Sequence, residues 1–254
     1  MRRKRLVAVL AAIVLALTAC TAATETGQSA SAPTVSVESA VPAASSSPES
    51  RDPAPAFSSE PAESPSSTPE KEHILIAYFT WAENTVVEDP SAVDVDATTS
   101  ASVLLPGNAA KLAGWIQQEV GGDLFSIVVE EPYSSDYDEC LDRAADEKAQ
   151  NARPELQNHV EDMSQYDVVF FGFPNWWYTV PMAVHTFLEE YDFSGKTIVP
   201  FVTHGTGGLA STIEDITAGL PEDVTILEPI GVYRLDVDGA QGAVKEWLAG
   251  LEIS

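Results

Sequence analysis

The sequence predicts an α/β domain: a doubly wound, five-stranded parallel sheet with helices on both faces. Two observations carry this prediction. Five short runs rich in β-branched and aromatic residues recur along residues 72–254, and several are apolar without alternation, as is typical of strands covered on both faces. Stretches with helical periodicity separate the runs, and this alternation of strands and helices indicates a parallel sheet with right-handed crossovers.

The predicted strands and helices follow one another in chain order. Apolar side chains at helical spacing form three stripes, each of which predicts an amphipathic helix. The predicted strands are residues 74–79, 124–129, 168–173, 197–202 and 224–227. The stripes are Leu112, Trp115, Ile116 and Val120; Val184, Phe187 and Leu188; and Val244, Trp247 and Leu248.

Residues 1–19 predict a lipoprotein signal peptide. A basic stub at residues 2–5 is followed by an apolar stretch at residues 6–17, which is shorter than the roughly 20 residues that a membrane-spanning helix needs. The small residues before Cys20 resemble a bacterial lipobox, so we expect cleavage before Cys20 and lipidation of this residue. The protein would then be anchored at the extracytoplasmic face of a bacterial cell membrane. An ordinary signal peptide with a cysteine at its cleavage site is the alternative.

Residues 20–71 are predicted to link the lipidated cysteine to the domain. After Cys20 they consist mainly of Ser, Ala, Pro, Thr and Glu, so they carry too little apolar surface to offset the entropy of an ordered chain. We therefore expect a disordered tether with a reach of about 40 Å or more. The folded domain is expected at residues 72–254, which are enough for one hydrophobic core.

Charge and cysteine content narrow the function classes. The formal net charge of -26 repels nucleic acid and anionic lipid headgroups, so we expect no nucleic-acid partner and no membrane contact beyond the lipid anchor. The two cysteines, Cys20 and Cys140, exclude a disulfide framework, and Cys140 lies in a helical pattern typical of packing, with a redox thiol as the alternative. No histidine pair has metal-ligand spacing and no Gly-x-Ser-x-Gly motif is present, so neither a metal site nor a hydrolase is indicated.

Three loops of unusual composition follow predicted strands. In doubly wound sheets ligands bind at the carboxyl ends of the strands, near the point where the strand order reverses. We therefore expect ligand contacts from these loops. The first begins with Thr80, Trp81 and Ala82 and ends with Gly107, Asn108 and Ala109; the second is Pro174, Asn175, Trp176, Trp177, Tyr178 and Thr179; the third contains Thr203, His204, Gly205, Thr206 and Gly207.

At these residues the chain resembles the flavodoxin-like proteins, in particular their exported branch. The resemblance lies in "ILIAYFT", in "GFPNWWYTVPMAVHTFLEEYDFSGKTIVPFVTHGTGG" and in the amphipathic helices that follow, and it extends over residues 72–254. It implies the strand order 2-1-3-4-5 and a bound FMN. By the same resemblance, the first loop would hold the phosphate, and the second and third loops would flank the isoalloxazine ring.

The residues offer physical reasons for these roles. A phosphate dianion favours hydroxyls and free amides at a helix N-terminus, which Thr80 and Asn108 can provide. A flavin ring favours an aromatic face, and Trp176, Trp177 and Tyr178 are the candidates, with packing in the core as the alternative. His204 is expected either near the ring carbonyls or in solvent.

The first loop departs from the pattern of the resembled family. It has no glycine among its first residues, and Glu83 would repel a phosphate unless it points away. We therefore expect a split loop, with residues 83–106 as an excursion that forms a surface flap or a disordered loop. Ala109 stands where the family has a threonine, which removes one hydroxyl donor.

The predicted function is that of an FMN-binding redox protein with no catalytic side chain of its own. It would act as an electron-transfer shuttle or as a reductase of quinones or other small acceptors, and its donor and acceptor are unknown. A flavin-free binding or interaction module on the same scaffold is the alternative, because the first residues of the first loop contain Glu83 and no glycine, and because Ala109 removes one hydroxyl donor.

Overall fold

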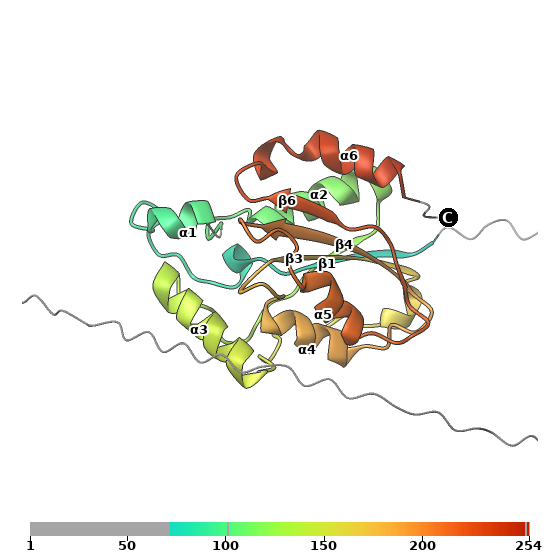
Figure 1. Ribbon diagram of the computed structural model, residues 1–254, viewed down its shortest axis with the longest axis horizontal. Coiled ribbons are helices and arrows are strands. Elements are labelled where there is room, and N and C mark those ends of the chain that lie inside the picture. The colour runs from blue at the N-terminus through green and yellow to red at the C-terminus, as the bar shows by residue number, and fades with distance from the viewer. Residues whose placement is uncertain (1–71, 101, 252, 254) are drawn as a thin grey trace, which may run out of the picture. The chain divides into compact units, whose positions relative to one another are not determined.

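The computed structural model describes residues 72–100, 102–251 and 253 (Figure 1). The predicted signal peptide, the predicted lipidation at Cys20 and the predicted tether lie outside the described residues and remain predictions. Within the described ranges, no helix has the length and apolar character needed to cross a membrane.

The domain is built on a parallel sheet whose strand order is β2-β1-β3-β4-β5. This arrangement confirms the predicted fold class and strand order. Every neighbouring pair along the sheet is parallel. The strands are β1 (Ile74–Tyr78), β2 (Asp123–Ser126), β3 (Val168–Pro174), β4 (Thr197–His204), β5 (Thr225–Ile226) and β6 (Ile230–Tyr233).

The sixth strand corrects the predicted count of five. β5 pairs with the beginning of β4 at Thr197 and Ile198, whereas β6 pairs with the end of β4, from Phe201 to His204. The two short strands therefore share one edge position of the sheet. Pro229 lies between them, and proline interrupts a ladder because it has no amide hydrogen to donate. As a result, β6 carries the chain to the same end of the sheet as the three predicted loops.

Helices cover both faces of the sheet. Figure 1 shows α2 and α6 on one side and α3, α4 and α5 on the other. The helices are α1 (Val95–Ser100), α2 (Asn108–Val120), α3 (Tyr137–Gln150), α4 (Met182–Glu190), α5 (Thr212–Ala218) and α6 (Gln241–Ala249). Three short 3-10 helices complete the described chain: η1 (Trp81–Glu83), η2 (Met163–Gln165) and η3 (Val237–Gly239).

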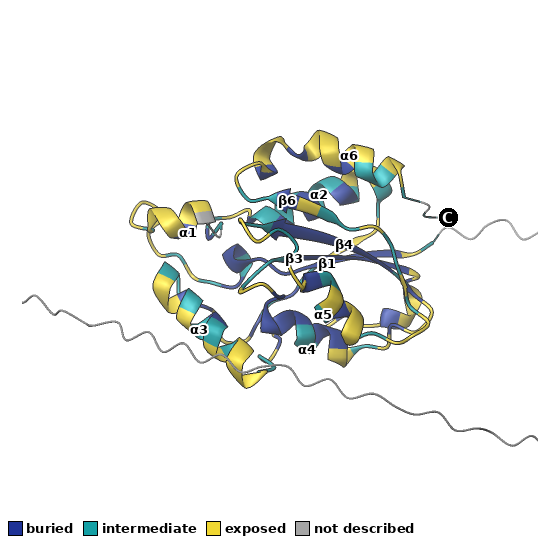
Figure 2. Cartoon of the chain, viewed as in Figure 1, coloured by how far each residue is buried: buried dark blue, intermediate teal, exposed yellow. Residues whose placement is uncertain are grey.

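Alternate side chains of β1 enter two separate cores. Ile76 packs with the α2 and α6 side chains Leu112 and Val244, whereas Leu75 packs on the opposite face with the α4 side chain Phe187. Burial of such a side chain contributes about 1.5–3 kcal/mol, so both faces stabilise the sheet. Figure 2 shows the strands buried in the middle of the domain and the outward faces of the helices exposed.

Most of the described residues of the excursion at 83–106 are exposed, as expected for a surface segment, but two of its side chains anchor it to the core. It contains α1, and its side chains Ala97 and Val103 are fully buried in the core cluster. The amide of Val103 donates to the carbonyl of Ala97 at 3.2 Å. This anchoring brings the chain back to the sheet before Gly107.

Candidate functional site

A recess at the carboxyl ends of the strands brings together parts of all three predicted loops. Ten of the predicted residues line it, together with one residue that the sequence did not point to, Arg234. The predicted residues in its wall are Thr80, Trp81, Asn108, Ala109, Pro174, Asn175, Trp176, Thr203, His204 and Gly205. The sheet topology accounts for this gathering, because β1, β3, β4 and β6 all end at this edge.

The split first loop closes at Gly107. A Cβ atom placed on Gly107 would lie 1.9 Å from the Thr80 Oγ1 atom and 3.1 Å from the Ala82 Cβ atom, so only glycine allows this contact. Thr80 is buried, with 3% of its surface exposed. The two halves of the loop, separated in the sequence by residues 83–106, therefore form one continuous wall.

The N-terminus of α2 opens onto the same wall. Gly107 is its N-cap residue and has no side chain to cap the helix. Within the described ranges, no acceptor pairs with the amides of Asn108, Ala109 or Ala110, and the amide of Lys111 is the first to donate, to the Gly107 carbonyl at 3.0 Å. Free first-turn amides and the helix dipole make such an end a binding site for an anion.

Asn84 fixes the start of the first loop. Its buried side chain donates to the carbonyls of Thr80 at 2.9 Å and Ile127 at 3.0 Å, and it accepts from the amide of Val129 at 2.8 Å. The loop after β1 is thereby tied to the segment after β2. The role of Asn84 could not be predicted from the sequence, because an asparagine in a loop of this composition carries no distinguishing signal.

Glu83 points away from the recess. Its carboxylate accepts hydrogen bonds from the hydroxyls of Tyr78 and Ser126, at the ends of β1 and β2. Burial and the nearby Glu83 carboxylate raise the pKa of Tyr78 to about 12, so the tyrosine stays a neutral donor at physiological pH. The expected repulsion between Glu83 and an anion in the first loop is therefore absent.

The second loop forms a tight turn with an unusual tip. The amide of Trp176 donates to the carbonyl of Thr179 at 2.9 Å, and the amide of Thr179 donates back at 3.0 Å. Between them, Trp177 and Tyr178 have φ values of 52° and 67°. Turns of this kind normally place Asn and Gly at these two positions, because a bulky residue with positive φ is strained. Such strain persists where the surrounding structure enforces it, often at functional sites.

The two tryptophans have different environments. Trp176 packs edge-to-face against Phe79 and Tyr133, with ring centroids 5.4 Å apart in each pair, and it also lines the recess. Trp177 is 43% exposed, and its Nε1 atom donates to the carbonyl of Leu141 in α3 at 3.1 Å. One indole therefore joins the core to the recess, and the other lies over α3.

A second recess adjoins the first on the α3 side. The two share Trp81, Asn175, Trp176 and Arg234. The second is completed by Tyr137, Cys140, Leu141, Ala144 and Trp177. Two of the shared residues, Trp81 and Trp176, are tryptophans, so a flat ligand extending from the first recess toward the second would meet aromatic side chains.

The second and third loops are bonded to each other. The amide of Asn175 donates to the Thr203 carbonyl at 2.8 Å, and its side chain donates to the Gly208 carbonyl at 2.6 Å. His204 is partly buried, and its Nδ1 atom lies 2.9 Å from the Gly205 carbonyl oxygen. His204 therefore lines the recess and is not a solvent histidine.

Six of the predicted residues line neither recess: Ala82 and Gly107 of the first loop, and Tyr178, Thr179, Thr206 and Gly207 at the tips of the other two loops or behind them. Thr206 and Gly207 are exposed, and Tyr178 lies beside Gly207, since a Cβ placed on Gly207 would be 3.2 Å from the tyrosine ring. Thr179 is buried and donates its hydroxyl to Asp215 of α5. These residues shape the loops rather than line the recesses.

Cys140 is a buried thiol, as predicted for a packing residue. It is 4% exposed, and burial raises its pKa to about 12, so it is a neutral thiol at physiological pH. No group of three or more His, Cys, Asp or Glu side chains arranged to hold a metal ion occurs in the part of the chain that the structure describes.

Comparisons with known proteins agree with the fold. A family model described as Flavodoxin matches residues 95–249, and no curated protein matches the chain. A solved protein of Bacteroides eggerthii, described as a flavoprotein, is 27% identical over 72% of this chain and 99% of its own, with a TM-score of 0.54. One from Bacteroides uniformis with the same description is 22% identical over 71% of this chain and 99% of its own, with a TM-score of 0.50. A Lactobacillus acidophilus flavoprotein in complex with FMN is 20% identical over 68% of this chain and 99% of its own, with a TM-score of 0.45.

Proposed function

The chain belongs to the flavodoxin family, and from this premise and the geometry of the recess we propose that it binds FMN and acts as a redox protein. The observation that carries the proposal is the anion-binding wall formed by Thr80, Gly107 and the free amides at the start of α2. The first recess contains this wall at one side and aromatic side chains at another, which matches the two chemically different ends of FMN.

The described residues fit the phosphate. The Thr80 hydroxyl and the amides of Asn108 to Ala110 supply donors, and the positive end of the α2 dipole favours a dianion. Any side chain at position 107 would collide with Thr80, so the glycine is required for this wall. With Glu83 turned toward Tyr78 and Ser126, its carboxylate does not oppose binding.

The described residues also fit the ring. Trp176 presents an indole to the recess, and Trp177 extends the aromatic surface over the second recess. Offset stacking of aromatic rings adds about 0.5–1.5 kcal/mol beyond the burial of area. The hydrogen bonds between Asn175 and the third loop hold the two loops at a fixed separation, which orients a flat ligand between them.

When bound, FMN supplies the one-electron and two-electron redox chemistry that no side chain provides. The role of the protein is to hold the ring, limit its contact with water and set the electrostatic surroundings. The net charge of -26 disfavours extra negative charge on the ring, which lowers its reduction potential. We propose that the protein passes electrons between partners or reduces a quinone or another small acceptor.

The lipid anchor is a proposal of its own. It is supported by the apolar stretch and the small residues before Cys20. In a bacterial host, a Cys20→Ser protein should move from the membrane fraction to the soluble fraction, and metabolic labelling with a fatty acid should disappear. Membrane association and labelling that persist in this variant would contradict the anchor.

Titration with FMN tests the redox proposal. We expect the full chain to take up one FMN per molecule, with flavin absorption bands that shift and flavin fluorescence that is quenched on binding. Reduction of the complex and its reoxidation by a quinone would then separate a reductase from a carrier that needs a protein partner. No spectral change with FMN in excess would overturn the proposal and favour a flavin-free binding module.

A further inference from the structure

Arg234 is a cation that has no partner in the described part of an acidic chain. Seven Lys and Arg residues lie in the described ranges, and for six of them the side chain is bound by a carboxylate or a carbonyl. Arg234 makes no side-chain hydrogen bond or ion pair with any described residue, and its buried Nε atom has no acceptor. The pairs are Lys111 with Asp238, Arg143 with Glu147, Arg153 with Glu189, Lys245 with Glu119, Lys148 with the Trp177 carbonyl and Lys196 with the Tyr166 carbonyl.

The backbone of Arg234 connects the anion-binding wall to the third loop. Its carbonyl accepts from the Asn108 side chain at 3.3 Å, and its amide donates to the His204 carbonyl at 2.8 Å. Asn108 is the first residue of α2, so the backbone of Arg234 lies beside the helix end that carries the free amides. The position directly follows β6, which accounts for its presence at this edge of the sheet.

The guanidinium lies against the glycine of the third loop. A Cβ placed on Gly205 would lie 2.7 Å from the Arg234 Nη1 atom, so glycine allows the side chain to approach. The Cζ atom is 5.9 Å from the Tyr233 ring centroid, at the outer limit of a cation–π contact. The guanidinium therefore has no strong partner among the residues that the structure describes, and Arg234 lines the same recess as Thr80 and Ala109.

We propose that Arg234 binds the phosphate of FMN and takes the place of the hydroxyl that is missing at Ala109. This inference rests on the proposed function. The phosphate is the part of oxidised FMN that carries charge, and a planar guanidinium with several N–H donors suits it better than a neutral hydroxyl. Together with the helix amides, the arginine makes the site selective for a flavin phosphate over an uncharged flavin.

The test compares FMN with riboflavin, which lacks the phosphate. In the full chain, Arg234→Gln should weaken FMN binding about 10- to 100-fold, as expected for the loss of a hydrogen-bonded charge. Riboflavin binding should change less than about twofold, because the neutral ligand has no group for the guanidinium. Arg234→Lys should restore part of the FMN affinity, since lysine keeps the positive charge but cannot donate two parallel hydrogen bonds as a guanidinium does.

Lys111→Gln is the matched control. It removes one positive charge from the first turn of α2, where Lys111 is paired with Asp238 and does not line the recess. We expect its FMN affinity to stay within about threefold of the wild type, because screened surface charges contribute little. Circular dichroism melting of each variant shows that it is folded.

The outcomes separate the two proposals. FMN binding unaffected by Arg234→Gln, or weakened no more than by Lys111→Gln, overturns the role of Arg234 while the FMN site stands. Equal losses for FMN and riboflavin overturn it too, because the arginine would then serve the ring or the fold. If the wild type binds neither flavin, the proposed function itself fails.

Discussion

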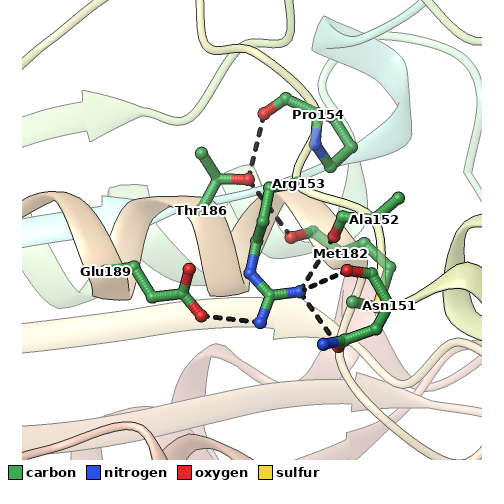
Figure 3. A network of polar contacts seen from close by, with 7 residues as sticks. All are labelled: Asn151, Ala152, Arg153, Pro154, Met182, Thr186 and Glu189. Carbon is green, nitrogen blue, oxygen red and sulfur yellow. Dashed lines mark hydrogen bonds and ion pairs between the residues drawn. The ribbon is translucent and has the colours of Figure 1, made fainter.

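Arg153 and Arg234 are two arginines in contrasting surroundings. Figure 3 shows Arg153 surrounded by acceptors: its Nη1 atom donates to the Asn151 and Ala152 carbonyls and to the Asn151 side chain, each at 3.0 Å. Its Nη2 atom donates to Glu189 of α4 at 2.6 Å. Arg234 has no such acceptor among the described residues, although both arginines have an Nε atom without a partner. The two sites therefore differ in how the Nη atoms are used.

This difference separates an arginine that stabilises the fold from one available to a ligand. Arg153 ties the segment after α3 to α4, and Thr186 of α4 strengthens the link by donating to the Pro154 carbonyl at 2.9 Å (Figure 3). A buried polar group without a partner costs about 1–3 kcal/mol. The chain has 39 acidic residues that could pair with Arg234, so an unpaired guanidinium in a recess indicates a place for an anion from outside the chain.

The largest effect is expected from closing the recess at Gly107. In a Gly107→Ala variant the new Cβ would overlap the Thr80 hydroxyl, and either the loop or the start of α2 must move. We expect FMN affinity to fall about 100-fold or more, because at least two hydrogen bonds to the phosphate are lost. Fluorescence titration with FMN measures this effect.

Gly114→Ala is the control for that substitution, because Gly114 lies in the same helix and a Cβ there meets nothing within 4 Å. It should bind FMN like the wild type and gain about 0.5–1 kcal/mol of stability, since alanine favours helix more than glycine. An FMN affinity for Gly107→Ala equal to that of Gly114→Ala would show that the phosphate does not bind at this wall.

The second largest effect is expected from Arg153→Gln, which should lower the stability of the fold and leave FMN binding unchanged. Arg153→Gln removes the ion pair with Glu189 and most of the carbonyl contacts, so we expect the free energy of unfolding to fall by about 2 kcal/mol, a value limited by the partial exposure of both side chains. FMN affinity should stay within about twofold. Urea unfolding of Arg153→Gln and Arg234→Gln side by side tests the contrast, because Arg234→Gln removes a buried Nε–H that has no acceptor among the described residues and should therefore not lower the free energy of unfolding. The contrast fails if Arg234→Gln is the more destabilised of the two.

The alternation of strands and helices in the sequence predicted which loops form the site. Continuous apolar strands and helical stripes indicated the sheet, and the sheet brings the ends of β1, β3 and β4 to one edge. The return of the first loop at Gly107 was also predictable, because a glycine directly before a helical stripe suits a close backbone approach. The structure confirms the strand order and the family match agrees with the resemblance.

The sequence did not predict Arg234, for two physical reasons. Its strand, β6, is only four residues long, contains Gly231 and follows Pro229, so its β signal is weak. Whether an arginine is paired also depends on neighbours that are distant in sequence, such as Asn108, which lies 126 residues away. The environments of Trp176 and Trp177 were unpredictable for a similar reason, because adjacent residues of one type give no indication of which enters the core.

The smallest effect concerns the tip of the second loop. Tyr178 is 66% exposed and has a φ of 67°, a conformation that glycine adopts without strain and that costs other residues about 1–2 kcal/mol. We therefore expect Tyr178→Gly to raise the free energy of unfolding by about 1 kcal/mol, less than the full relief because glycine also adds freedom to the unfolded chain.

Tyr178→Ala is the matched control, because alanine removes the same ring and keeps the strain, so it should bring no gain in urea unfolding. If Tyr178→Gly is more stable than Tyr178→Ala, the backbone at the tip of the second loop is strained. The tip would then resemble Arg234 and not Arg153, because both Tyr178 and Arg234 keep an unfavourable local arrangement beside the recess, which we attribute to the ligand. If the two variants are equally stable, the positive φ carries no strain, and the contrast between satisfied and unsatisfied regions is confined to the arginines.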